Sequence, residues 1–183
     1  MIIKNLSEIK NTTLPIIIIG SGPAGISAAI KLEKNKIKSL ILEAGDIGYN
    51  KNSAEYLKGS VVGDKYPDLS TLRLRQFGGT SGLWGGNCNP FREDDFDEWP
   101  IKLNDINKYE SEAKEILNLK NEFFNEKFSN NLRYYNLSWS NVRFGKKYLD
   151  HIKKSKYIHL SLNTNFLNFN GKNKKIDSLK CLK

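Results

Sequence analysis

The sequence has few of the residues that build metal centres and disulfide frameworks. It holds two cysteines, Cys88 and Cys181, and two histidines, His151 and His159, among 183 residues. The cysteines lie far apart and form neither a CxxC pair nor the ligand spacing of a zinc site. We therefore expect no metal site and a reduced, cytoplasmic protein.

Long hydrophobic runs are also missing. The longest aliphatic stretch covers residues 16–19, whereas a membrane-spanning helix needs about 20 apolar residues. Residues 1–14 mix lysine, asparagine and glutamate with isolated aliphatics, so they lack the apolar core of a secretory signal. With 39% hydrophobic and 27% charged residues, the composition is typical of a globular protein without a transmembrane segment.

The chain carries a formal net charge of +9, which raises the question of nucleic acid or an anionic membrane as partner. The excess is mostly lysine, spread along the chain instead of gathered in an arginine-rich stripe. No helix-turn-helix, zinc or RNP pattern accompanies it. We interpret the charge as a solvated surface that also helps attract an anionic cofactor or substrate, and we expect no nucleic-acid partner.

The clearest pattern is a βαβ unit over residues 15–45. Residues 16–19 are a run of isoleucine, typical of a buried parallel strand. Apolar residues then recur at helical spacing over residues 23–35, and a second apolar strand follows at residues 39–43. Parallel strands joined by a helix cross over right-handed. The sequence therefore predicts an α/β, Rossmann-like fold with a parallel sheet, in which these two strands are central.

The turn of this unit carries the GxGxxG motif of dinucleotide-binding proteins, at residues 20–25. Gly20 allows a tight turn, Gly22 lets the backbone approach a pyrophosphate, and Gly25 lets the helix pack close to the strand. The N-terminus of the helix then offers free N–H groups and the positive end of its dipole to the phosphates. The alternative is an ordinary βα turn that binds no ligand.

A carboxylate at the end of the second strand narrows the choice of nucleotide. Glu43 can accept hydrogen bonds from ribose hydroxyls, and it argues against the 2′-phosphate of NADP. The glycines do not decide between FAD and NAD. The position of the motif near the N-terminus and the continuation of Glu43 into Ala44 and Gly45 both favour FAD.

A second glycine-rich segment, GGTSGLWGGN, covers residues 78–87. Glycines at this density let a backbone lie flat against a planar or charged ligand. Thr80 and Ser81 offer hydroxyl groups, and Trp84 offers the face of a ring. The alternative is a mobile surface loop that a buried tryptophan anchors.

The patterns outside these motifs are weaker. Residues 46–70 are polar and predict a long connecting segment with one short helix. Asn104 or Asp105 can cap a helix that runs to about Leu117. Residues 120–150 are rich in aromatics and are expected to be irregular.

The C-terminal part, residues 157–182, is predicted to be β structure. A strand is expected at 157–162, and residues 166–170 and 176–182 predict a hairpin around a Gly-Lys-Asn turn at 171–173. We interpret this hairpin as the start of an inserted β-meander. Because the sequence stops while a strand is in progress, we expect an incomplete domain.

Together the two glycine motifs resemble the glucose–methanol–choline (GMC) oxidoreductases. The resemblance rests on GSGPAGISAA at residues 20–29, LEAG at 42–45 and RQFGGTSGLWGGNCNPF at 75–91. An acidic segment and Trp-Pro-Ile at 99–101 follow in the same order as in a bacterial branch of that family. The resemblance covers nearly all of the chain, but only about the first third of a typical member. It implies that residues 1–183 are an N-terminal FAD-binding domain, with the substrate domain largely absent.

The resemblance also implies an FAD site built from both motifs. Glu43 would hold the adenosine ribose and Trp84 would lie near the isoalloxazine. The second motif contains no histidine that could link the flavin covalently, so we expect non-covalent FAD. We expect Cys88 to be a neutral thiol near the flavin and not a site of covalent attachment. The cofactor-binding residues implied are Gly20, Ser21, Gly22, Pro23, Ala24, Gly25, Glu43, Ala44, Gly79, Thr80, Ser81, Trp84, Gly85, Gly86, Asn87 and Cys88.

The implied reaction is FAD-dependent oxidation of a CH–OH group in an alcohol or a sugar. In this family a histidine base lies in a C-terminal segment, which this sequence does not contain, so no catalytic residue is named. His151 and His159 fall in or beside the strand at 157–162 and are expected to be structural or exposed. A complementing C-terminal segment would be one partner. The alternatives are a truncated, inactive nucleotide-binding module and an NAD-binding enzyme of another family, against which the second motif argues.

Overall fold

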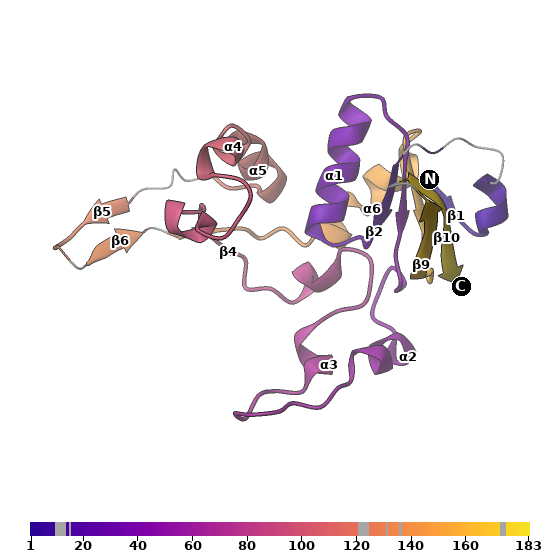
Figure 1. Cartoon of the computed structure of the whole chain (residues 1–183), viewed down its shortest axis with the longest axis horizontal. Coiled ribbons are helices and arrows are strands. Elements are labelled where there is room, and N and C mark those ends of the chain that lie inside the picture. Colours follow the sequence, from indigo (N-terminus) through magenta and orange to yellow (C-terminus); the bar gives the residue numbers. More distant parts are fainter. Residues whose placement is uncertain (10–13, 15, 121–124, 131, 136, 173–174) are drawn as a thin grey trace. The chain divides into compact units, whose positions relative to one another are not determined.

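The computed structural model describes residues 1–9, 14, 16–120, 125–130, 132–135, 137–172 and 175–183, so Pro15 at the start of the predicted βαβ unit lies outside them. The chain divides into two compact units. The first unit combines Met1–Leu83 with Arg143–Lys183, and the second is Trp84–Val142. Figure 1 shows the elements coloured along the sequence.

A four-stranded parallel sheet forms the centre of the first unit. Its order is β1 (Ile2–Ile3), β8 (Ile158–Ser161), β3 (Ser39–Leu42) and β2 (Ile16–Ile19). All three pairings are parallel, which confirms the predicted α/β fold. The prediction that both strands of the βαβ unit are central holds for β3 and is wrong for β2. Among the described strands, β2 has a neighbour on one side only.

Two helices cover one face of this sheet, α1 (Pro23–Lys34) and α6 (Phe144–Lys154) (Figure 1). Side chains alternate between the faces of a strand, so Ile41 and Leu160, which are paired in register, point to the same side. Both are fully buried, as are Ile26 of α1 and Ile152 of α6. This apolar layer fixes the start of α1 over the end of β2.

The opposite face of the sheet lies toward an antiparallel hairpin of β9 (Asn165–Lys172) and β10 (Lys175–Leu182) (Figure 1). The predicted turn falls partly on residues 173–174, outside the described part of the chain. Between the sheet and the hairpin lies an apolar hollow of about 590 Å³, lined in part by Ile17 and Ile19 of β2. These residues are 42% and 55% exposed, so the prediction of a buried strand is wrong for them.

The polar stretch expected over residues 46–70 contains more helical turns than predicted. Asn50 caps the first by accepting hydrogen bonds from two backbone N–H groups, and Asp68 caps the last through Ser70. Such side-chain caps let very short helices form in polar sequence. The short helical elements of the first unit are a 3-10 turn at Leu6–Ile9, α2 (Lys51–Ala54), a 3-10 turn at Glu55–Leu57, α3 (Leu69–Leu72) and a 3-10 turn at Gly79–Gly82.

The described residues of the second unit form two small strand pairs and two helices, and the single helix predicted up to Leu117 is divided. Asp105 accepts a hydrogen bond from the backbone of Lys102, so the first helix begins earlier than either predicted cap. The second helix ends at Asn118, which has a left-handed backbone. The elements are β4 (Asn87–Cys88) paired with β7 (Ser138–Trp139), β5 (Asn125–Lys127) paired with β6 (Arg133–Tyr135), a 3-10 turn at Glu93–Phe96, α4 (Leu103–Asn107) and α5 (Glu110–Leu117).

Helix α6 corrects the expectation that residues 120–150 are irregular throughout. Arg143 precedes the helix and gives no side-chain cap, so the sequence carries no local start signal. The hydroxyl of Ser81 takes that role, because it accepts the hydrogen bond of the Phe144 N–H. His151 consequently lies in α6 and not in or beside a strand. Within the described residues, every helix is too short or too polar to cross a membrane.

Candidate dinucleotide site

The GxGxxG turn connects β2 to α1 in the geometry that close helix–strand packing requires. Gly20 has φ of +92°, and its N–H donates to the carbonyl of Leu42 at 2.8 Å. A Cβ at Gly25 would lie 2.1 Å from the carbonyl oxygen of Gly20, so only glycine fits there. A Cβ at Gly20 or Gly22 would meet no atom within 4 Å. The backbone at these two residues therefore borders open space.

The N-terminus of α1 at this turn is suited to an anion. Gly22 is the N-cap residue, no side chain caps it, and Pro23 occupies the first turn, where the missing N–H costs nothing. The first N–H groups of a helix have no partner within the helix, and the helix dipole makes this end positive. An oxygen of a phosphate placed over Gly22 would meet both effects.

Glu43 follows β3 and is held in place by the same turn. Its Oε2 accepts from the N–H of Ser21 at 2.9 Å and from the Ser21 hydroxyl at 2.5 Å. Its Oε1 accepts from the N–H of Gly45 at 2.7 Å. Glu43 is only 6% exposed and Ser21 is fully buried. The carboxylate thus joins the glycine turn to the chain just after β3.

Within the first unit, the start of the second glycine motif contacts the first motif. The N–H of Gly78 donates to the carbonyl of Ser21 at 3.0 Å. A Cβ at Gly79 would lie 3.1 Å from the Cα of Gly22. Gly78 and Gly79 have φ of +88° and +57°, a backbone that glycine adopts without strain. Two motifs about 55 residues apart in the sequence therefore form one surface.

Thr80 and Ser81 differ in their surroundings. Thr80 is exposed, and its hydroxyl accepts from the N–H of Leu74 at 3.3 Å. Ser81 is buried, donates to the carbonyl of Gly78 at 2.6 Å and accepts from the Phe144 N–H at 3.1 Å. The Ser81 hydroxyl therefore fixes the second motif on α6.

Sequence reasoning missed the partner of the second motif, Gly145. A Cβ at Gly78 would lie 2.1 Å from the nitrogen of Gly145, and a Cβ at Gly145 would lie 2.5 Å from the carbonyl oxygen of Phe77. Phe77 and Phe144 are both 1% exposed. Two Phe-Gly pairs thus cross each other closely. The repeat of this dipeptide at 77–78 and 144–145 is the signal that could have indicated the contact.

The remaining residues of the second motif, 84–88, belong to the second unit. Trp84 donates through Nε1 to the carbonyl of Val142 at 2.8 Å. Gly86 has φ of +83°, and a Cβ there would lie 2.0 Å from the carbonyl oxygen of Ser140. Trp139 Nε1 donates to the carbonyl of Gly85 at 2.5 Å. Residues 84–86 of the motif therefore pack against residues 139–142, which precede α6 in the sequence.

Cys88 ends this segment in a half-buried position. Its Sγ lies 3.4 Å from the carbonyl oxygen of Gly86. Burial raises the pKa of the Cys88 thiol, against a smaller opposite effect of a hydrogen bond with the Ser140 backbone. The thiol is therefore neutral and weakly nucleophilic at neutral pH.

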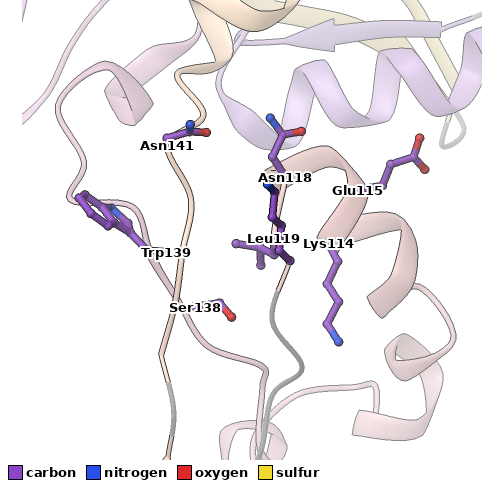
Figure 2. Close-up of a pocket in the computed structure, with 8 residues that line it drawn as sticks. Lys114, Glu115, Asn118, Leu119, Ser138, Trp139 and Asn141 are labelled. Carbon is purple, nitrogen blue, oxygen red and sulfur yellow. The ribbon is translucent and has the colours of Figure 1, made fainter.

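The second unit also has a hollow of about 890 Å³ near the end of α5, shown in Figure 2. Asn118 and Lys114 lie on one side of it, and Trp139 and Asn141 on the other (Figure 2). The hydroxyl of Ser138 is buried there and has no hydrogen-bond partner among the residues that the structure describes. Most of the lining side chains are exposed, as is usual for a polar surface.

The two histidines of the first unit have different surroundings. His151 is half exposed and pairs with Glu33 of α1. His159 lies in β8 and is 8% exposed. Burial lowers its pKa, with a further contribution from the positive N-terminus. Among the residues that the structure describes, no three of His, Cys, Asp or Glu gather as metal ligands would.

Comparisons with known proteins agree with this geometry. The family described as "NAD(P)-binding Rossmann-like domain" matches residues 18–67, which include the first glycine motif and Glu43. No curated protein sequence matches the chain. Among solved structures, pyridoxine 4-oxidase from Mesorbium loti is similar with a TM-score of 0.55 and 14% sequence identity, over 93% of this chain and 46% of that chain. This chain thus spans about half the length of that structure. The matches and the parallel sheet show an α/β protein with a Rossmann-like NAD(P)-binding domain.

Proposed function

We propose that the chain is the FAD-binding N-terminal part of a flavin-dependent oxidoreductase that acts on a CH–OH group of an alcohol or a sugar. The observation that carries the proposal is the contact between the two glycine motifs. Gly79 lies against Gly22, and the N–H of Gly78 donates to the carbonyl of Ser21. A single Rossmann turn serves many nucleotides, whereas this second glycine layer suits a longer, planar ligand.

The residues present fit the ADP half of FAD. Open space borders Gly20 and Gly22, no side chain caps the N-terminus of α1, and a carboxylate follows β3. In this proposal Gly22 lies against the pyrophosphate and Glu43 accepts from the ribose. When bound, FAD would accept the hydride of the substrate carbinol, and the protein would supply position and electrostatics.

The second motif would extend the site toward the flavin ring. We assign that role to Gly79 and Thr80, while Ser81 holds the motif on α6. For residues 84–88, a cofactor role is implied by the resemblance alone. Cys88 would be a neutral neighbour, because burial raises its pKa, and the flavin would be bound without a covalent link. We assign no catalytic base to this chain.

Two further observations support an oxidoreductase. The similar solved structure is an oxidase by name, and the order and spacing of both motifs resemble the GMC family. A second candidate is a module that binds NAD, and the description of the matching family favours it. The two candidates differ in the ligand, so one binding experiment separates them.

The test is binding of FAD and of NAD to the purified chain. Released flavin is identified after denaturation, and added FAD is titrated by the quenching of its fluorescence. We expect FAD at about one per chain, and NAD weaker by at least tenfold. A chain that takes up NAD and not FAD supports the second candidate.

Gly22→Ala tests whether the ligand lies over the glycine turn. Its Cβ meets no protein atom, so stability should not change, but it occupies the space of the pyrophosphate. We expect FAD affinity to fall by about tenfold or more. Gly48→Ala is the matched control, because its Cβ also meets open space and it lies outside both motifs. Equal affinities of the two variants would contradict the proposed site.

A further inference from the structure

Glu43 is a buried carboxylate whose hydrogen-bond donors come from two residues, Ser21 and Gly45. Transfer of an unpaired charge into a protein interior is costly unless hydrogen bonds replace its water. Here Ser21 and Gly45 supply three donors, and no cation pairs with Glu43 among the described residues. The orientation of this carboxylate is therefore set by hydrogen bonds alone.

Ser21 contributes two of these donors and lies between the first two glycines of the motif. Its N–H and its hydroxyl both donate to Oε2 of Glu43, at 2.9 and 2.5 Å. Its carbonyl accepts from Gly78 of the second motif. Ser21 is fully buried, so its hydroxyl is not in contact with solvent. One residue thus connects the glycine turn, the acidic residue and the second motif.

The division of donors leaves one oxygen of Glu43 with spare capacity. An ionised carboxylate offers about four acceptor positions, two on each oxygen. Oε2 uses both for Ser21, and Oε1 uses one for the N–H of Gly45 at 2.7 Å. Oε1 can therefore accept one more hydrogen bond, and it is held in a single orientation.

We propose that Ser21 is a positioning residue that orients Glu43 so that Oε1 accepts from the ribose diol of an adenine dinucleotide. The inference rests on the proposed function, because it places a dinucleotide on the glycine turn. Without the hydroxyl, the carboxylate keeps one backbone donor on each oxygen, the N–H of Ser21 on Oε2 and the N–H of Gly45 on Oε1, so its orientation is held less firmly. The fixed, unpaired negative charge also opposes a 2′-phosphate at the same ribose.

The test compares FAD with an analogue whose adenosine ribose lacks both hydroxyls. Affinities of both ligands are measured for the wild type, Ser21→Ala and Ser53→Ala. Ser53→Ala is the control, because Ser53 is also buried and its hydroxyl also makes hydrogen bonds, but to Arg75 and not to Glu43. Ser21→Cys provides a second variant of similar size with a weaker donor if Ser21→Ala does not fold.

The wild type is expected to prefer FAD over the analogue by about tenfold, the value of one hydrogen bond to a charged group. Ser21→Ala should reduce the preference to less than threefold, while Ser53→Ala should keep it. If Ser21→Ala weakens both ligands equally, the hydroxyl is only structural and the inference fails alone. If the wild type binds neither ligand, the proposed function fails and this inference fails with it.

Discussion

Gly25 is the residue at which the turn leaves the least room. A Cβ there would overlap the carbonyl oxygen of Gly20 at 2.1 Å and would lie 3.1 Å from the side chain of Ile18. In an open helix, alanine is more favourable than glycine by roughly 0.5–1 kcal/mol. At this position the backbone overlap outweighs that gain, because the strand cannot move away from the helix without breaking the sheet.

Gly25→Ala is therefore expected to lower the free energy of unfolding by about 2 kcal/mol or more, the range of overpacked sites. Urea unfolding followed by circular dichroism measures this change. Gly22→Ala, one turn earlier and next to open space, should change stability by less than about 0.5 kcal/mol. Similar stabilities of the two variants would show that the turn relaxes easily.

At the scale of elements, α6 and the second glycine motif form one structural feature. Their backbones cross at the two Phe-Gly pairs, and the hydroxyl of Ser81 closes the first turn of the helix. A change in the helix therefore alters the motif, although the two are more than 60 residues apart in sequence.

Gly145→Ala tests this coupling. Its Cβ would meet the carbonyl oxygen of Phe77 at 2.5 Å, so the crossing must open. We expect a loss of about 2 kcal/mol in stability and faster amide hydrogen exchange at residues 77–82. Gly48→Ala should change neither quantity. Unchanged exchange at 77–82 in Gly145→Ala would show that the motif holds its shape without the helix.

The elements that could be predicted are those with local signals. The isoleucine run, the glycine turn and the amphipathic spacing gave β2, α1 and β3, because each pattern lies within a few residues of the element it forms. The start of α6 could not be predicted, because its cap lies in another part of the chain. The exposure of Ile17 and Ile19 was missed for a similar reason, since burial depends on the partner of each face.

In the candidate site, too, features with local sequence signals could be predicted and long-range contacts could not. The open space at Gly22 and the packing role of Gly25 follow from the motif, and the structure has both. The contacts of Glu43 with Ser21 and of Ser81 with Phe144 could not be read from spacing. They depend on how separate loops meet after the sheet has formed. Their assignment to FAD remains a proposal.

At the scale of the whole molecule, an apolar hollow lies between the sheet and the hairpin. Ile17 and Ile19 line it together with Phe169 and Ile176, which are 56% and 60% exposed. Contiguous apolar surface of this kind is uncommon on a soluble monomer. We expect the native chain to bind the dye ANS and to increase its fluorescence several-fold.

Replacement of both Ile17 and Ile19 by threonine should reduce this signal by at least half, because threonine keeps the β-branched shape and removes apolar area. The control is Val62→Thr, since Val62 is 95% exposed and does not line the hollow. Equal ANS fluorescence in both variants would place the dye elsewhere.

The order of the strands in the sheet has a consequence for synthesis on the ribosome. β3 is completed by residue 42, but its second neighbour, β8, begins at residue 158. A nascent chain therefore carries an unpaired edge of β3 for more than 100 residues of elongation. The hydrogen bond between the Ser81 hydroxyl and the Phe144 N–H also cannot form until Phe144 has been synthesised. At 5–20 residues per second this interval lasts roughly 5–25 seconds. During that time the unpaired edge is open to association with other chains, and slower translation would lengthen the exposure.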